Sequence, residues 1–115
     1  MPKLNDPEIL AIIEAAFRER ACVSYVHWEP DAENELSRDS TLRSTRVEEV
    51  IVAEFAAGLQ PDIEIQKPDS GYEGETRYVW RITVDGIELY VKACVGRDHL
   101  NEAVVTFVRC HVSWY

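Results

Sequence analysis

Residues 78–93 read YVWRITVDGIELYVKA, and this pattern is typical of a β-hairpin. Asp85-Gly86 in its middle favours a two-residue turn of the type I′ class, in which both residues take a positive φ. Such a turn fixes the register of the two strands that it joins. We therefore expect four cross-strand pairs, which are Val84 with Ile87, Ile82 with Leu89, Trp80 with Val91, and Tyr78 with Ala93.

These eight side chains share one face of the hairpin, which we call the inner face. Its burial against helices stabilises the fold by on the order of 10 kcal/mol before conformational entropy is subtracted. The opposite, outer face is expected to be open to solvent or to a partner. It carries Arg77, Val79, Arg81 and Thr83 on one strand and Glu88, Tyr90, Lys92 and Cys94 on the other.

Two helices are predicted upstream of the hairpin. The first covers about residues 7–20, because Asp6-Pro7 is a typical helix start and apolar residues then recur at helical spacing. The second covers residues 46–57, where Thr45 and Glu48 form a capping-box pattern and Gly58 favours a left-handed stop.

The rest of the chain is read as strands and connections. The stretch 22–28 predicts a short strand, 62–66 another and 103–112 the last one. Turns are predicted at Pro68–Gly71 and at Gly96–Asp98. The polar residues 29–44 are interpreted as a connection, with one turn of helix after Pro30 as the alternative.

Together these elements predict a single α+β domain over residues 1–115. Two N-terminal helices pack on one face of an antiparallel sheet of four strands, or of five if 22–28 joins it. The last strand adds one of two sets to the outer face, and the sequence leaves both open. One set is Arg109 with Phe107 and Val105, and the other is Cys110 with Val108 and Thr106.

Composition limits the classes of function. The 115 residues carry a formal net charge of −9, which repels phosphate backbones unless the positive charges gather on one surface. No apolar run has the length of a membrane span and the N-terminus lacks a secretory signal, so a cytoplasmic protein without membrane contact is expected. The three cysteines are read as reduced thiols, and their spacing to the three histidines predicts no metal site. No phosphate loop or cofactor fingerprint is present, so no cofactor is predicted.

The arrangement of residues 45–111 resembles the RelE-like and BrnT-like bacterial toxins. The features that carry it are the capped helix from Thr45 to Gly58, the acidic strand Asp62–Gln66 and the three strands around Asp85-Gly86 that end in Val104–Phe107. Trp28-Glu29-Pro30, with Asn34 and Arg38 downstream, adds a fainter likeness to the BrnT-like start. The resemblance implies a helix pair on an antiparallel sheet. It also implies a messenger-RNA endonuclease that uses the RNA's own 2′-hydroxyl as nucleophile.

That chemistry requires a base, a proton donor and cations beside the developing phosphorane charge. By their place on the outer face, Arg77, Arg81, Lys92 and Arg109 are the candidates to hold phosphate. Tyr90 and His111 are the candidates for proton transfer. Active toxins of this kind are usually basic, so an inactive relative is an alternative for this acidic chain.

A second hypothesis comes from a different class of function. An acidic antitoxin-type or immunity-type protein would mask a basic protein partner through the first helix and residues 29–39. The partner would then be a cognate toxin, whereas a toxin would have a cognate antitoxin. The C-terminal Trp114-Tyr115 are expected to pack on the domain itself, and a homodimer contact is the alternative.

Overall fold

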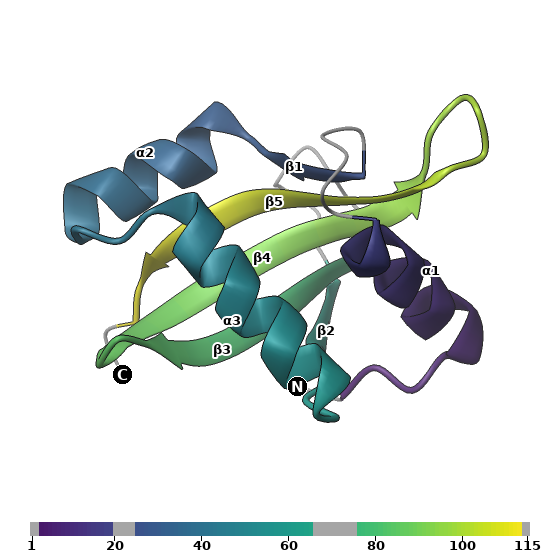
Figure 1. The fold of residues 1–115 in the computed structure, drawn as a ribbon, viewed down its shortest axis with the longest axis horizontal. Helices are drawn as coiled ribbons and strands as arrows, with labels where there is room; N and C mark the ends of the chain where they lie inside the picture. Colours follow the sequence, from purple (N-terminus) through teal and green to yellow (C-terminus); the bar gives the residue numbers. More distant parts are fainter. Residues whose placement is uncertain (1–2, 20–24, 66–75, 114–115) are drawn as a thin grey trace.

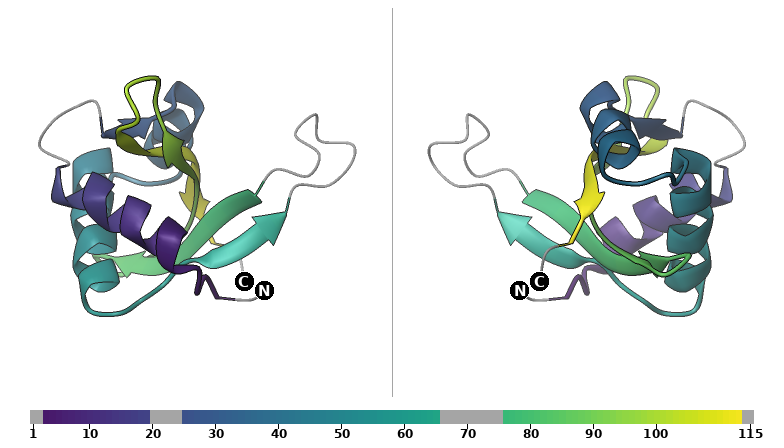
Figure 2. Two further views of the ribbon diagram at one scale, coloured as in Figure 1. Left: turned by 90° about the vertical axis from the view of Figure 1, so that its right-hand side faces the viewer. Right: turned by 90° about the vertical axis from the view of Figure 1, so that its left-hand side faces the viewer.

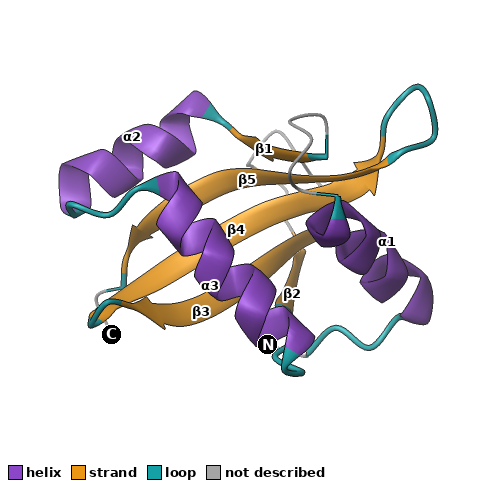
Figure 3. Cartoon of the chain, in the orientation of Figure 1, coloured by secondary structure: helices purple, strands orange, loops and turns teal. Residues whose placement is uncertain are grey.

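The computed structural model describes residues 3–19, 25–65 and 76–113, and within these ranges it confirms an α+β fold (Figures 1 and 3). Three helices pack against one five-stranded sheet. The helices are α1 (Pro7–Arg18), α2 (Pro30–Asp39) and α3 (Ser44–Ala56). The strands are β1 (Val26–Trp28), β2 (Asp62–Ile65), β3 (Thr76–Val84), β4 (Ile87–Arg97) and β5 (Ala103–Val112).

The β3–β4 hairpin has the predicted turn and register. Asp85 and Gly86 take φ values of 51° and 84°, as a type I′ turn requires. All four predicted cross-strand pairs are present. Ile87 is half-buried and the other seven of the eight inner-face side chains are buried. The alternation of apolar side chains in the sequence therefore predicted the inner face correctly.

The sheet order is β1-β5-β4-β3-β2, and β1 differs from the prediction. Strands β2 to β5 are antiparallel neighbours, but β1 pairs with β5 in parallel, with Val26 opposite Val105. The expectation of an all-antiparallel sheet is therefore wrong at this edge. A strand of three residues has too few residues for the sequence to indicate its direction.

Helices α1 and α3 cover the inner face. Figure 2 shows them on one side of the strands, with no described helix over the other side. Their aromatic side chains meet those of the sheet, and the ring centroids of Phe17 lie 5.6 Å from Phe55 and 6.0 Å from Trp80. Phe107 is fully buried and lies 6.2 Å from Trp80. These aromatic rings lie between the two helices and the sheet, within a core that is otherwise mainly aliphatic.

The helix ends confirm two predictions and correct one. The Asp6 carboxylate accepts a hydrogen bond of 2.9 Å from the backbone N–H of Glu8, so it caps α1. Gly58, just beyond α3, has the expected left-handed φ of 104°. The capping box at Thr45 is wrong, because α3 begins at Ser44 after Arg43 and no side chain caps it.

Residues 30–39 form a complete helix, α2, rather than a connection. Ala32 and Leu36 lie four residues apart and are both buried, so α2 has a narrow apolar stripe. The other eight residues of α2 are Pro30 and seven polar or charged side chains. Two apolar residues are too few to indicate a helical period from the sequence. The predicted two-helix layer is therefore a set of three helices.

A β-bulge decides which residues β5 places on each face. The register shifts between Lys92 and Ala93, so that Lys92 pairs with Arg109 and Ala93 pairs with Phe107. Phe107 and Val105 consequently point inward while Arg109 points outward. Each of the two predicted outer-face sets is therefore correct only in part, since Arg109 of the first set and Thr106 of the second lie on the outer face.

One predicted turn lies further along the chain, and three other predictions concern residues outside the described ranges. Gly96 and Arg97 still belong to β4, so the turn expected at Gly96–Asp98 lies further along, where Asn101 donates its backbone N–H to Asp98. The loop at Pro68–Gly71, the start of the first strand at Cys22 and the C-terminal Trp114-Tyr115 lie outside the described residues.

Candidate functional site

Tyr90 lies at the centre of a polar cluster on the outer face. It stands opposite Arg81 of β3 and His111 of β5 in the sheet. The Tyr90 and His111 rings are stacked, with centroids 5.0 Å apart, and the Arg81 guanidinium carbon lies 5.8 Å from the Tyr90 ring centroid. Three adjacent strands therefore bring together three of the predicted site residues.

Glu64 of β2 joins this cluster, and the sequence analysis missed it. Its carboxylate accepts a hydrogen bond of 2.6 Å from the Tyr90 hydroxyl and forms an ion pair of 2.7 Å with the Lys92 ammonium. Val79 shares this face and is only 1% exposed. The alternation of Ile63 and Ile65 with acidic residues predicted a strand, but its register against β3 was needed to place Glu64 here.

The other two predicted cations lie at the margins of the cluster. The Arg109 guanidinium turns toward α2 and binds the Glu35 carboxylate through two hydrogen bonds of 2.9 and 2.7 Å. Arg77 stands opposite Glu64 and is only 9% exposed. The cluster therefore consists of Arg81, Tyr90, Lys92 and His111 with Glu64, and Arg109 adjoins it as the cross-strand partner of Lys92.

Helix α2 lies along the edge of β5 at residues 109–112, past the residues that pair with β1. Glu35 accepts a hydrogen bond of 3.2 Å from the Cys110 N–H, and the pKa of Asp39 is lowered by Arg38 and also by the backbone N–H of Val112. The spacings match, because four helical residues rise about 6 Å and two strand residues about 6.8 Å. Two carboxylates of α2 thus protect an edge that would otherwise pair with another chain.

The protonation of this contact follows from its geometry. Burial alone would raise the pKa of Glu35, but hydrogen bonds from Arg109 and Cys110 and the charge of Arg109 outweigh burial, so the pKa lies below its ordinary value. The same pair raises the pKa of Arg109. Behind it, burial and the nearby Glu35 charge raise the pKa of the Cys110 thiol to about 12. Glu35 is therefore ionised and Cys110 is neutral near neutral pH.

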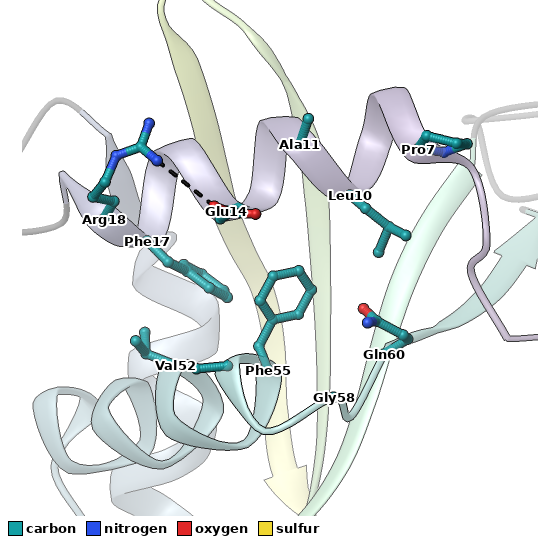
Figure 4. A pocket seen from close by; sticks show the side chains of 11 residues that line it. Pro7, Leu10, Ala11, Glu14, Phe17, Arg18, Val52, Phe55, Gly58 and Gln60 are labelled. Carbon is teal, nitrogen blue, oxygen red and sulfur yellow. Dashed lines mark ion pairs between the residues drawn. The ribbon is translucent and has the colours of Figure 1, made fainter.

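A groove of about 700 Å³ separates α1 from α3 (Figure 4). Its lining is mainly apolar and includes Leu10, Phe17, Val52 and Phe55. Gln60 lies at one end, and its buried amide oxygen has no hydrogen-bond partner among the described residues. This groove is on the helical side of the molecule, away from the Tyr90 cluster.

Charge is divided unequally between the two layers. The three helices contain nine acidic and three basic residues, a formal net charge of −6. The strands β2 to β5 contain three acidic and five basic residues, a formal net charge of +2. The helical layer is thus the acidic part of the described chain.

The chemistry available to the Tyr90 cluster is limited by its internal pairing. Glu64 binds Lys92, and Tyr90 lies between Arg81 and His111 on the outer face. Among the described residues no group of three histidine, cysteine or acidic side chains is arranged to hold a metal ion. None of the described helices is long and apolar enough to cross a membrane.

Comparison with family models, with curated proteins and with solved structures finds no match to this chain. The likeness to RelE-like and BrnT-like toxins therefore stays a prediction.

Proposed function

We propose that this protein is a binding domain for a basic protein partner, and that the acidic helical layer supplies the contact surface. The observation that carries the proposal is the division of charge, −6 in the helices against +2 in strands β2 to β5. Complementary charge accelerates association and selects the sign of the partner. An antitoxin-type or immunity-type inhibitor of a basic toxin has this requirement.

The helical carboxylates are well placed for such a contact. Glu8 and Glu14 of α1 and Asp31 and Glu33 of α2 are all exposed. By contrast, Glu35 and Asp39 face β5 and are used within the fold. The contact predicted for the whole of residues 29–39 is therefore narrowed to the outward side of α2, together with α1 and α3.

The basic residues of the sheet offer less to an anionic partner. Lys92 is bound by Glu64 and only 15% of its side chain is exposed, while Arg109 is bound by Glu35. Arg77 is buried. Most of the positive charge on the outer face is thus already compensated within the protein, which supports a protein partner over RNA.

A pair of matched charge reversals tests the proposal. The probe is a labelled peptide of lysine and serine, and its binding is measured by fluorescence anisotropy. We expect Glu14→Lys with Glu33→Lys to weaken binding about tenfold at low salt, and Glu88→Lys with Glu102→Lys on the sheet side to change it much less. Binding should fall as salt rises from about 50 to 300 mM, because the Debye length shortens. Equal effects of the two double variants would refute a contact through the helical layer.

Contact with RNA, or its cleavage, is the second candidate function. The observation that favours it is the stack of Tyr90 on His111 with Arg81 beside the same ring. An exposed arginine next to an aromatic platform is a typical arrangement for single-stranded nucleic acid. Together with the resemblance to RelE-like and BrnT-like toxins, it makes the outer face the surface to test.

A labelled single-stranded RNA of mixed sequence separates this candidate from the first. We expect binding or cleavage at low salt to be lost in Arg81→Ala and kept in Arg97→Ala, because Arg97 is exposed at the far end of β4 and donates to the Asn101 carbonyl. If the wild-type protein neither binds nor cleaves the RNA, this candidate is excluded.

A further inference from the structure

We infer that the groove between α1 and α3 is where a basic amphipathic helix of the partner docks, an inference that rests on the function proposed above. The groove lies within the acidic layer and has an apolar floor. Helices that bind in grooves present apolar residues at positions i, i+3, i+4 and i+7. Three features of the groove support this docking mode, and they are its apolar floor, the charge of the helices that form its walls, and Gln60.

The floor of the groove is apolar and aromatic. The Phe17 and Phe55 rings meet edge to face, with centroids 5.6 Å apart, and Figure 4 shows them between the two helices. Leu10, Val52 and Phe55 are each half-buried, so part of their surface still contacts solvent. A third helix laid over them would remove that surface from water, at about 25 cal/mol per Å².

The groove's own lining holds one acidic and one basic residue, Glu14 and Arg18, but the two helices that form its walls, α1 and α3, carry five acidic and two basic residues in all. Glu14 stands on α1 with 71% of its side chain exposed, and it is joined to Arg18 only across 3.7 Å. On α3, Arg46 is the sole basic residue, and it is held by Asp85 at 2.8 Å. These walls favour lysine and arginine on both sides of an apolar stripe. They disfavour a second copy of this chain, which would bring its own net charge of −9.

Gln60 supplies a polar contact at one end of the groove. Its amide oxygen is buried without a hydrogen-bond donor among the described residues, which is costly in a folded protein. The first turn of a helix has N–H groups that find no partner within that helix. Once the Gln60 amide turns toward the groove, a backbone N–H at the N-terminus of a docked helix or a lysine ammonium would donate to this oxygen.

Two labelled peptides of about 18 residues, the length of five helical turns, serve as probes. One places leucine at the i, i+3, i+4 and i+7 positions with lysine elsewhere. The other keeps every lysine and replaces each leucine with serine. We expect the leucine-containing peptide to bind about tenfold more tightly or better, because only it fills the floor.

Three variants locate the contact. Val52→Asp places a charge on the floor, and Ala11→Trp fills the groove without removing an existing contact. Both should abolish the advantage of the leucine-containing peptide. Leu100→Asp is the matched control, because it adds the same charge at a residue that is 68% exposed outside the groove, and it should leave binding unchanged. Circular dichroism and thermal unfolding confirm that each variant is folded.

The outcomes separate this inference from the proposed function. If both peptides bind equally well and neither groove variant has an effect, the groove is not the docking site although the acidic layer still binds cations. If neither peptide binds, the proposed function itself fails. If Leu100→Asp weakens binding as much as Val52→Asp, the groove is again excluded.

Discussion

The two faces of the sheet are built from the same strands but are held in different ways. The inner face is stabilised by burial, and Trp80, Val91 and Phe107 are each 1% exposed or less. The outer face is organised by two carboxylates, Glu64 of the edge strand β2 at the Tyr90 hydroxyl and Glu35 of α2 at Arg109. Hydrophobic burial is non-directional, whereas these contacts require a particular register.

The difference has a consequence for function. Substitutions on the inner face test the fold, and those on the outer face test local contacts that leave the fold intact. A binding surface is altered most safely where removal of a side chain does not unfold the domain. Substitutions on the two faces and at the contact of α2 with β5 should therefore differ in their effect on the free energy of unfolding, from the largest at the inner face to the smallest.

The largest effect is expected at Phe107 on the inner face. Phe107→Ala should lower the free energy of unfolding by about 3–5 kcal/mol, because it leaves a cavity beside Trp80 and Trp28. Tyr90→Ala removes an aromatic ring of similar size from the outer face and should cost less than half as much. Urea denaturation measures both values, and equal costs would show that the two faces are packed alike.

Glu35→Gln is expected to have the next largest effect. It should lower the free energy of unfolding at neutral pH by about 1–2 kcal/mol, since the charge-assisted bonds to Arg109 are weakened. Because the pKa of Glu35 is lowered on folding, its contribution is present above the ordinary value of 4.5 and is lost as pH falls through the folded value. The wild type should therefore converge on the variant in urea denaturation at low pH.

Glu33→Gln is the control for that experiment. Glu33 lies on the same helix, is exposed, and should show no comparable change in the free energy of unfolding. A difference between wild type and Glu35→Gln that persists unchanged at about pH 3 would contradict the ionic account of the edge contact.

The inner face and the outer face also differ in how far the sequence predicts them. The alternation of residues 78–93 and the Asp85-Gly86 turn gave the inner-face pairs correctly, because a two-residue turn leaves one register. The outer-face cluster depends on Glu64, whose strand is separated from β3 by a longer connection. Its register is set by tertiary contacts that no local pattern encodes.

The same reason explains what was missed in β5 and α2. The bulge at Val108 arises from the pairing of two strands, so β5 alone does not reveal that Phe107 and Arg109 face opposite sides. In α2, Glu35 and Asp39 read as a solvated acidic face. Their role appears only when the edge of β5 lies beside them, with the N–H groups of Cys110 and Val112 turned toward the helix.

A double-mutant cycle measures the contact that organises the outer face. Glu64→Gln should cost more than Tyr90→Phe because it also weakens the ion pair with Lys92, and the two should be coupled by about 1 kcal/mol because both change the same hydrogen bond of 2.6 Å. Urea denaturation of the four proteins gives the coupling. Strictly additive effects would mean that the Glu64 contact does not stabilise the cluster, which would then be free to rearrange around a ligand.

The smallest effect at neutral pH is expected from the two described cysteines, which lie on opposite faces. Cys110 is buried on the inner face and its pKa is raised to about 12, whereas Cys94 is half-buried on the outer face. A raised folded pKa contributes stability below the unfolded value near 9, and this contribution is lost as pH rises from there toward 12. Compared with Cys110→Ala, the wild type should therefore lose stability more steeply above about pH 9.

Thiol labelling examines the same contrast between Cys94 and Cys110 in the native protein. In a Cys22→Ser background, Cys94 should react with a disulfide reagent in the native protein, while Cys110 should react only at the rate at which the domain opens. The Cys94→Ser variant isolates the slow phase, and moderate urea should accelerate that phase alone. Fast labelling of Cys110 under native conditions would mean that α2 detaches readily from β5. The edge of the sheet would then be accessible, and β5 would become a second surface at which a partner strand can add to this protein.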